Sequence, residues 1–423
     1  MSAIDQLLDS IPIPRMVRVK QVFERPVIEN VERVLLARLE SKNTSPLIKP
    51  GQSVAVAVGS RGITALPNMV KTMIQFIKGQ GGVPFIVPAM GSHGGASAEG
   101  QQKMLDGFGI TEELVGAPIR ATMETVQIGV SENGLPVFVD KYAYEADAIV
   151  IINRIKPHIA FRGKYESGLM KMITIGLGKQ KGADICHELG FGKMAENIPA
   201  IARVILEKTN LIFAVGVLEN AYHELCGIEV LKNEEIEVGE PALLEEAKRL
   251  CSKIYFDALD VLIIDEIGKN ISGTGFDNNV VGRYHTPYCS GGPIISKIVT
   301  LDITDVSHGN GNGLGILDFT TKRAFDKFSF EHSYPNSLTS TVPLSVKIPM
   351  VLKNDKQGIQ AAIKTCNILD KTKVRMVRVK NTLRLGEIEV SENLIEEVRR
   401  NSNMEIVSSA YDLEFSEQGN LFE

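Results

Sequence analysis

The segment from residue 156 to residue 193 has the densest collection of side chains that could do chemistry. It contains nine Lys, Arg and His residues but only three acidic residues, and glycines and serines interrupt it repeatedly. Positive charge on a backbone that can approach a ligand closely suits an anion. Within this segment Lys171 stands in an apolar stretch, LMKMITIGL, where desolvation favours the uncharged, nucleophilic amine. The alternative is a lysine whose stem packs on apolar neighbours while its amine reaches water.

Two of the seven histidines follow directly after predicted strands. His93 follows a strand expected at 83–87, and His158 follows a strand expected at 146–152. An imidazole in such a place can accept and return protons near neutral pH. Each histidine, taken singly, is also compatible with an ordinary solvent-exposed loop residue.

The elements that must position these side chains follow a repeating order of strand, loop and helix. Residues 54–58, 83–87 and 146–152 are short apolar runs typical of buried strands. Apolar residues at helical spacing predict a helix over 66–77. This order is typical of a parallel α/β sheet, in which ligands bind at the carboxyl ends of the strands. Those ends carry Ser60, Arg61, His93, Arg154 and His158. Three successive tips with His or Arg favour one shared site over three unrelated polar loops.

The length of 423 residues suits two or three domains at roughly 100–200 residues each. The strand pattern restarts near residue 258, so we expect two α/β domains with mainly parallel sheets and the active site in the interdomain cleft. The predicted domains are a cofactor-binding N-terminal domain, 1–255, and a smaller C-terminal domain, 256–400, that closes over the substrate. The tail, 401–423, could return to the first domain.

Composition and missing motifs argue against several classes of function. Lys plus Arg number 46 and Asp plus Glu number 51, and a net charge of −5 without a basic block argues against nucleic-acid binding. The apolar runs are far shorter than the ~20 residues that span a bilayer, and the first residues lack a signal-peptide pattern, so we expect a cytoplasmic protein with no membrane partner. No C-x-x-C, G-x-G-x-x-G or G-x-x-x-x-G-K-[ST] occurs, which leaves the common zinc, dithiol and nucleotide-binding loops unsupported.

Four motifs together resemble the nickel-dependent lactate racemase family. They are G-S-H-G-G at 91–95, K-P-H at 156–158, S-G-x-x-K at 167–171, and a histidine sixteen residues after that lysine. The S-R tip at 60–61 fits the same pattern. Each motif alone is weak, but their order and spacing together are specific, and the resemblance covers most of residues 50–230.

The resemblance implies a cofactor and a role for each motif residue. The implied cofactor is a nickel pincer nucleotide (nickel pyridinium-3-thioamide-5-thiocarboxylic acid mononucleotide) tethered covalently to Lys171, with His187 as the protein's nickel ligand. His93 and His158 correspond to the acid and base that flank the substrate, and Arg61 corresponds to a phosphate- and substrate-binding arginine. The other implied cofactor-binding residues are Ser60, Ser167 and Gly168.

The implied reaction is racemisation or epimerisation at the α carbon of a 2-hydroxy acid by transient hydride transfer to this cofactor. Proteins that synthesise the cofactor are the implied partners, and the oligomeric state stays open. Where the lactate enzymes have a substrate-binding Gln and Lys, this chain has Gly282 and Arg283. We therefore expect a substrate larger than lactate, such as an aliphatic, dicarboxylic or sugar acid, with Lys269 and Arg283 as candidate contacts. Two alternatives are an NAD-type 2-hydroxy acid dehydrogenase and a non-catalytic nickel or cofactor carrier.

Overall fold

The computed structural model describes residues 2–60 and 62–422 and divides the chain into two compact units. The central unit is Arg25–Cys251, and the terminal unit combines Met1–Glu24 with Ser252–Glu423. The boundary near residue 251 lies close to the predicted one. The first 24 residues, however, belong with the second half of the chain, because strand β1 (Met16–Gln21) pairs with β14 (Glu387–Ser391). The tail likewise stays in the terminal unit, where β15 (Met404–Ile406) pairs with β1.

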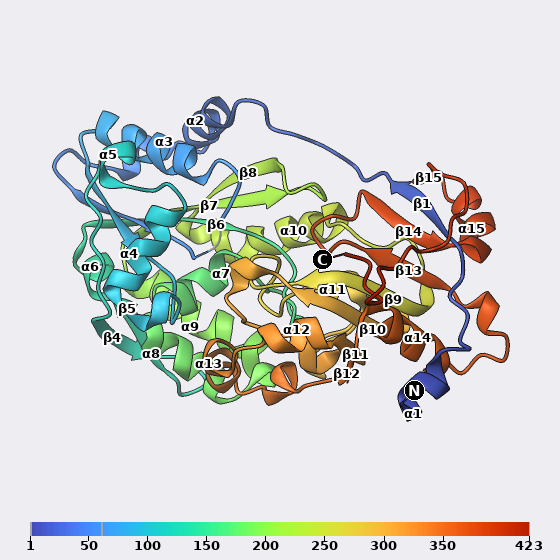
Figure 1. Cartoon of the computed structure of the whole chain (residues 1–423). Coiled ribbons are helices and arrows are strands. Elements are labelled where there is room, and N and C mark those ends of the chain that lie inside the picture. Colours follow the sequence, from blue (N-terminus) through green and yellow to red (C-terminus); the bar gives the residue numbers. More distant parts are fainter. Residues whose placement is uncertain (1, 61, 423) are drawn as a thin grey trace. The chain divides into compact units, whose positions relative to one another are not determined.

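The central unit is built on a five-stranded sheet (Figure 1). Its order is β3 (Val83–Pro88), β2 (Ser53–Val58), β6 (Ala148–Arg154), β7 (Leu211–Glu219) and β8 (Leu225–Lys232). The first four strands are parallel, and only β8 is antiparallel. Strands β2, β3 and β6 occupy the three apolar runs of the sequence. Their side chains are almost completely buried, which explains why these runs lack the polar alternation of a half-exposed strand.

Helices and one hairpin complete the central unit. The hairpin joins β4 (Thr125–Val130) and β5 (Pro136–Asp140). The helices are α2 (Val31–Ser41), α3 (Leu66–Gly79), α4 (Ala98–Gly107), α5 (Glu112–Val115), α6 (Lys141–Glu145), α7 (Leu169–Lys171), α8 (Lys179–Glu188), α9 (Met194–Lys208) and α10 (Asn233–Leu250). Helix α3 confirms the amphipathic pattern of the sequence, because its apolar side chains pack into the main core of this unit.

The terminal unit is built on an eight-stranded mixed sheet. Besides β1, β14 and β15, its strands are β9 (Ala258–Ile267), β10 (Ile294–Ile303), β11 (Phe319–Thr321), β12 (Met350–Leu352) and β13 (Met376–Val379). The five strands of this second list run parallel to one another. The helices are α1 (Ala3–Leu8), α11 (Asn278–Val281), α12 (Lys322–Lys327), α13 (Phe330–Ser340), α14 (Asp355–Thr365) and α15 (Ile395–Arg400). Each unit therefore has the mainly parallel α/β architecture that the sequence predicts.

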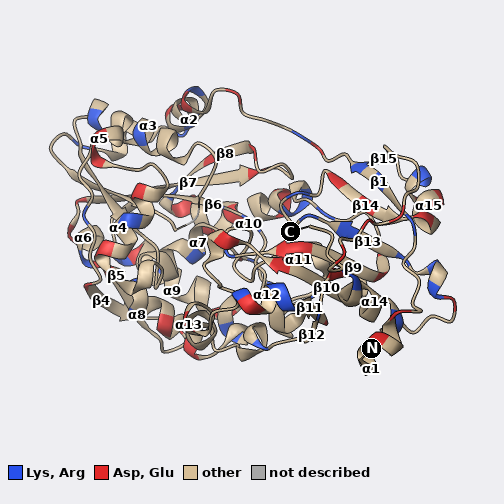
Figure 2. Cartoon of the chain, viewed as in Figure 1, with Lys and Arg blue, Asp and Glu red and all other residues tan. Residues whose placement is uncertain are grey.

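Charged residues of both signs are interspersed along the helices and loops of each unit (Figure 2). Within residues 2–60 and 62–422, no helix combines the length and apolar character needed to cross a membrane.

Candidate active site

The tips of three neighbouring strands in the central unit meet one segment, residues 168–176. Because β3, β2 and β6 are adjacent and parallel, their carboxyl ends lie along the same edge of the sheet. After β2, a Cβ added to Gly59 would lie 3.1 Å from Asn153 Oδ1 of β6 and 4.0 Å from Met172 Cε. After β3, the Gly91 N–H donates to the Gly176 carbonyl at 3.2 Å. The strand ends that were predicted to form one site therefore contact the segment around Lys171.

The first pair of predicted residues that the fold brings together is Ser60 and His93. Ser60 Oγ lies 2.5 Å from His93 Nδ1, so the tips of β2 and β3 are joined by a side-chain hydrogen bond. Arg61 was expected beside them and lies outside the described residues.

The second pair is His158 and Lys171, whose Nε2 and Nζ atoms are 2.8 Å apart. The chain makes this contact by folding back on itself, with Lys156 and Ser167 paired in an isolated antiparallel bridge. Buried Glu166 fixes the intervening loop by accepting the His158 backbone N–H at 2.7 Å. Ser167 thus forms one side of the bridge through its backbone, four residues before Lys171.

The direction of the hydrogen bond between His158 and Lys171 follows from a third group. The Ala160 backbone N–H donates to His158 Nδ1 at 3.0 Å, so that nitrogen carries no proton. A neutral imidazole then has its proton on Nε2, the atom that faces Lys171. A charged Lys171 has no lone pair with which to accept a hydrogen bond from His158 Nε2. If His158 accepted hydrogen bonds at both Nδ1 and Nε2, its ring would have to be an imidazolate anion. The arrangement therefore matches an uncharged Lys171 amine that accepts from His158.

The backbone that carries Lys171 is held by Glu240, Asn153 and a glycine. The Glu240 carboxylate is buried and accepts the Met170 N–H at 2.7 Å, while Asn153 Nδ2 donates to the Gly168 carbonyl at 2.8 Å. A Cβ on Gly168 would lie 2.0 Å from Glu240 Oε1, so any larger residue there would force the carboxylate or α7 to move. Burial raises the pKa of Glu240 to about 7. Lys171 ends α7 and is followed by a π-helical turn, Met172–Gly176, a distortion often found at functional sites.

His187 lies on α8 with one ring nitrogen committed to the protein. Its Nδ1–H donates to the Ala183 carbonyl at 2.7 Å, which leaves the lone pair on Nε2. Burial lowers the pKa of His187 and so favours the neutral ring, the form that binds metals. Metal-binding histidines commonly donate their second ring N–H to a carbonyl in this way.

Phe191 joins His187 to the pair of His158 and Lys171. Its ring centroid lies 5.7 Å from that of His187, in an edge-on arrangement, and 6.0 Å from that of His158. Phe161 covers His158 from 4.5 Å. The two phenylalanine rings therefore form an apolar surface beside both imidazoles.

The donor set does not amount to a metal site made by protein alone. In the part of the chain that the structure describes, no three His, Cys, Asp or Glu side chains cluster as they would around a metal ion. Cys186, next to His187, is buried, which raises the pKa of its thiol to about 12 and disfavours the thiolate needed to bind a metal. The one imidazole of His187, with a lone pair on Nε2, fits a metal ion whose other ligands come from a small molecule and not from the protein.

The two predicted residues of the terminal unit are held by their own surroundings. Lys269 Nζ donates to the Gly273 carbonyl at 2.9 Å and to Asn336 Oδ1 at 3.0 Å. The Arg283 guanidinium forms an ion pair with Asp318 and donates to the Ile295 carbonyl at 2.8 Å. Their substrate-binding roles stay predictions, and for Arg283 such a role requires that the ion pair opens.

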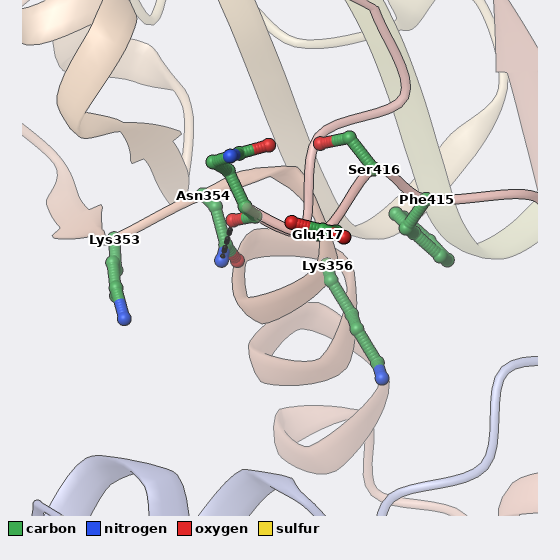
Figure 3. Close-up of a pocket in the computed structure, with 8 residues that line it drawn as sticks. Lys353, Asn354, Lys356, Phe415, Ser416 and Glu417 are labelled. Carbon is green, nitrogen blue, oxygen red and sulfur yellow. Dashed lines mark hydrogen bonds between the residues drawn. The ribbon is translucent and has the colours of Figure 1, made fainter.

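A surface hollow in the terminal unit contains none of the predicted residues (Figure 3). It lies between the start of α14 and the tail at 415–419. Asn354 Nδ2 donates to the Gln418 carbonyl at 2.6 Å, and the Lys356 N–H donates to the Gly419 carbonyl at 2.9 Å. These contacts show the tail capping α14 and give the hollow a structural explanation.

The central unit is therefore an α/β protein with a mainly parallel sheet, and a lysine and three histidines gather around the carboxyl ends of its strands. Residues 10–197 match the family model for the lactate racemase N-terminal domain. The matched region includes His93, His158, Lys171 and His187 and is similar to that domain over somewhat less than half of the chain.

Among solved structures, the chain resembles the lactate racemase apoprotein from Thermoanaerobacterium thermosaccharolyticum. The identity is 12% and the TM-score 0.53, over 88% of this chain and 99% of that one. At this identity the likeness concerns the fold. No match was found among curated proteins.

Proposed function

We propose that the protein is a racemase or epimerase acting on the α carbon of a 2-hydroxy acid with a nickel pincer nucleotide held on Lys171. The observation that carries the proposal is the grouping of His158 and His187 around Phe191, with Lys171 hydrogen-bonded to His158 and with His93 at the same edge of the sheet, after β3. The chemistry that this nucleotide supplies when bound is reversible acceptance of a hydride.

The residues fit such a group in two independent ways. The uncharged amine of Lys171 has the lone pair needed to form an amide-type bond. His187 Nε2 has the lone pair needed to bind nickel, for which imidazole is a suitable ligand. A cofactor that carries its own metal-binding atoms needs only a covalent attachment point, here Lys171, and one metal ligand from the protein, here His187.

The histidines would handle the proton of the substrate hydroxyl. Removal of the α hydrogen with its electron pair leaves a carbonyl only if the hydroxyl proton departs as well. Because Nδ1 of His158 accepts the Ala160 N–H, the proton of the neutral ring is on Nε2, from which His158 can donate it. His93, anchored through Nδ1 by Ser60, is the second acid–base group that inversion requires. The lysines of 156–193, together with Arg162, favour a substrate carboxylate.

The experiment is a screen of single enantiomers of 2-hydroxy acids in deuterated buffer, using protein produced together with the cofactor pathway. The expected result is the opposite enantiomer with its α hydrogen still protium, because a hydride does not exchange with solvent. Deuterium at the α carbon would indicate carbanion chemistry instead, and release of a 2-keto acid with reduction of NAD would indicate the dehydrogenase. Turnover of lactate alone would contradict the larger substrate.

A further inference from the structure

A completely buried lysine, Lys179, connects the helix of His187 to the loop of His93. It is the first residue of α8 and has a left-handed backbone, with φ of 54°. Its amine is surrounded by Asp140 Oδ2 at 2.9 Å, Gln101 Oε1 at 3.0 Å and the carbonyl of Pro88, the last residue of β3. Three acceptors match the three protons of an ammonium group.

Gln101 carries this contact to the tip that bears His93. The Gln101 side chain is buried in α4, and because its Oε1 faces Lys179, its amide nitrogen must face the opposite way. That nitrogen donates to the Gly91 carbonyl at 2.8 Å and to the His93 carbonyl at 3.3 Å. Both ends of the loop 91–93 are therefore held by one amide whose orientation Lys179 determines.

A buried ion pair is a poor way to gain stability. Neither Lys179 nor Asp140 is exposed to solvent, and the cost of desolvating two charges often exceeds their mutual attraction. A role in fixing one specific geometry explains such a pair better than a role in stability. The geometry fixed here is that of the His93 loop on α4 and β3 relative to α8, which bears His187.

We infer that Lys179, Asp140 and Gln101 form a positioning network that sets the His93 imidazole for proton transfer. None of the three touches the reacting atoms in this account. The inference rests on the proposed function for the catalytic role of His93, while the effect on the position of His93 can be measured without it.

The test uses the variants Q101M and Q101E with Q21M as the matched control. Methionine has nearly the shape of glutamine but no donor, and glutamate keeps an acceptor for Lys179 but lacks the donors to the loop carbonyls. Gln21 is equally buried and its amide also donates to two carbonyls, Leu385 at 2.8 Å and Lys253 at 3.2 Å, in the terminal unit. Q21M thus reproduces the loss of a buried two-carbonyl bridge away from the site.

The first readout is the set of histidine ring signals in the nuclear magnetic resonance spectrum of the protein without cofactor. We expect the His93 signals to move in Q101M and Q101E and to stay in place in Q21M. The second readout is steady-state kinetics of the loaded enzyme. A displaced acid–base group lowers kcat by about 10–100-fold with KM changed little, whereas Q21M keeps the parent kcat.

Unchanged His93 signals in both Gln101 variants would overturn the inference, and so would equal shifts in Q21M. If the parent protein racemises no 2-hydroxy acid, the proposed function fails. The ring signals then still decide whether the network positions His93. If one of the two Gln101 variants does not fold, it loses all its dispersed signals. The other Gln101 variant then tests the same contact.

Discussion

Lys171 Nζ and His158 Nε2 are 2.8 Å apart, while the Ala160 N–H occupies the other nitrogen of the imidazole. This relationship gives the lysine a partner that donates to it. An uncharged amine accepts a hydrogen bond through its lone pair, and the His158 imidazole, which Phe161 covers, is arranged to donate one. The uncharged amine is the nucleophilic form that the proposed covalent attachment requires.

The first prediction concerns the reactivity of Lys171 in the protein without cofactor. An exposed lysine is uncharged in about one molecule in 2,500 at pH 7. We expect Lys171 to react with a small acylating reagent at least about tenfold faster than exposed Lys71 on α3. Peptide mass spectrometry after brief labelling measures both rates in one sample. In H158F the advantage of Lys171 should fall, whereas equal rates for both lysines in the parent protein would contradict the hydrogen-bond direction inferred here.

The second prediction concerns the pH dependence of stability through Glu240. Burial raises its pKa from an ordinary value of 4.5 to about 7 in the folded protein, so the folded state binds more protons than the unfolded state between these values. The free energy of unfolding then falls as pH rises from about 4.5 to about 7. We expect E240Q to be more stable than the parent by ~1–3 kcal/mol at pH 8, with the difference largely gone at pH 4.5. Urea unfolding at both values measures this, and a difference independent of pH would be the contrary result.

The third prediction concerns the glycine that precedes the lysine helix. In G168A the new Cβ meets Glu240 Oε1 at 2.0 Å, so α7 or the carboxylate must shift. We expect a loss of ~1–3 kcal/mol in the free energy of unfolding and less cofactor on Lys171. The control is G79A, because a Cβ at Gly79 in α3 meets nothing within 4 Å and replaces a helical glycine by a better helix former. Equal stability of the two variants would count against the tight fit at Gly168.

The fourth prediction distinguishes covalent attachment of the cofactor at Lys171 from binding of nickel by His187. H187A removes the proposed nickel ligand but leaves Lys171 and His158 in place. We expect the covalent mass on Lys171 to persist while nickel is retained at least about tenfold less strongly. H332A, which alters an exposed histidine on α13, should keep both. Full nickel retention in H187A would assign the protein ligand to another residue.

The sequence allowed the strand tips to be predicted because their signals are local. The apolar runs of β2, β3 and β6 and the residues directly after them place Ser60, His93 and His158 at one sheet edge without any knowledge of distant contacts. The resemblance carried by S-G-x-x-K and the following histidine likewise pointed to Lys171 and His187. The fold brings His187 and His158, the hydrogen-bond partner of Lys171, to a common phenylalanine.

The supports of the site could not be predicted in this way. Glu240 lies 70 residues beyond Met170, and Lys179 lies 78 residues beyond Gln101, so no periodicity connects them. A buried charge also looks like a surface charge until the fold gives it partners. The assignment of β1 to the terminal unit has the same origin, since its pairing with β14 spans almost the whole chain.

The most direct test of the account is intact-mass and metal analysis of protein produced in cells that make the nickel pincer nucleotide. We predict a covalent mass increase that maps to Lys171, with about one nickel ion per chain, and neither in K171R. A lactate racemase loaded in the same cells verifies the cofactor supply. An unmodified Lys171 without nickel under those conditions would contradict the account and leave the site as an anion-binding pocket lined by a reactive lysine.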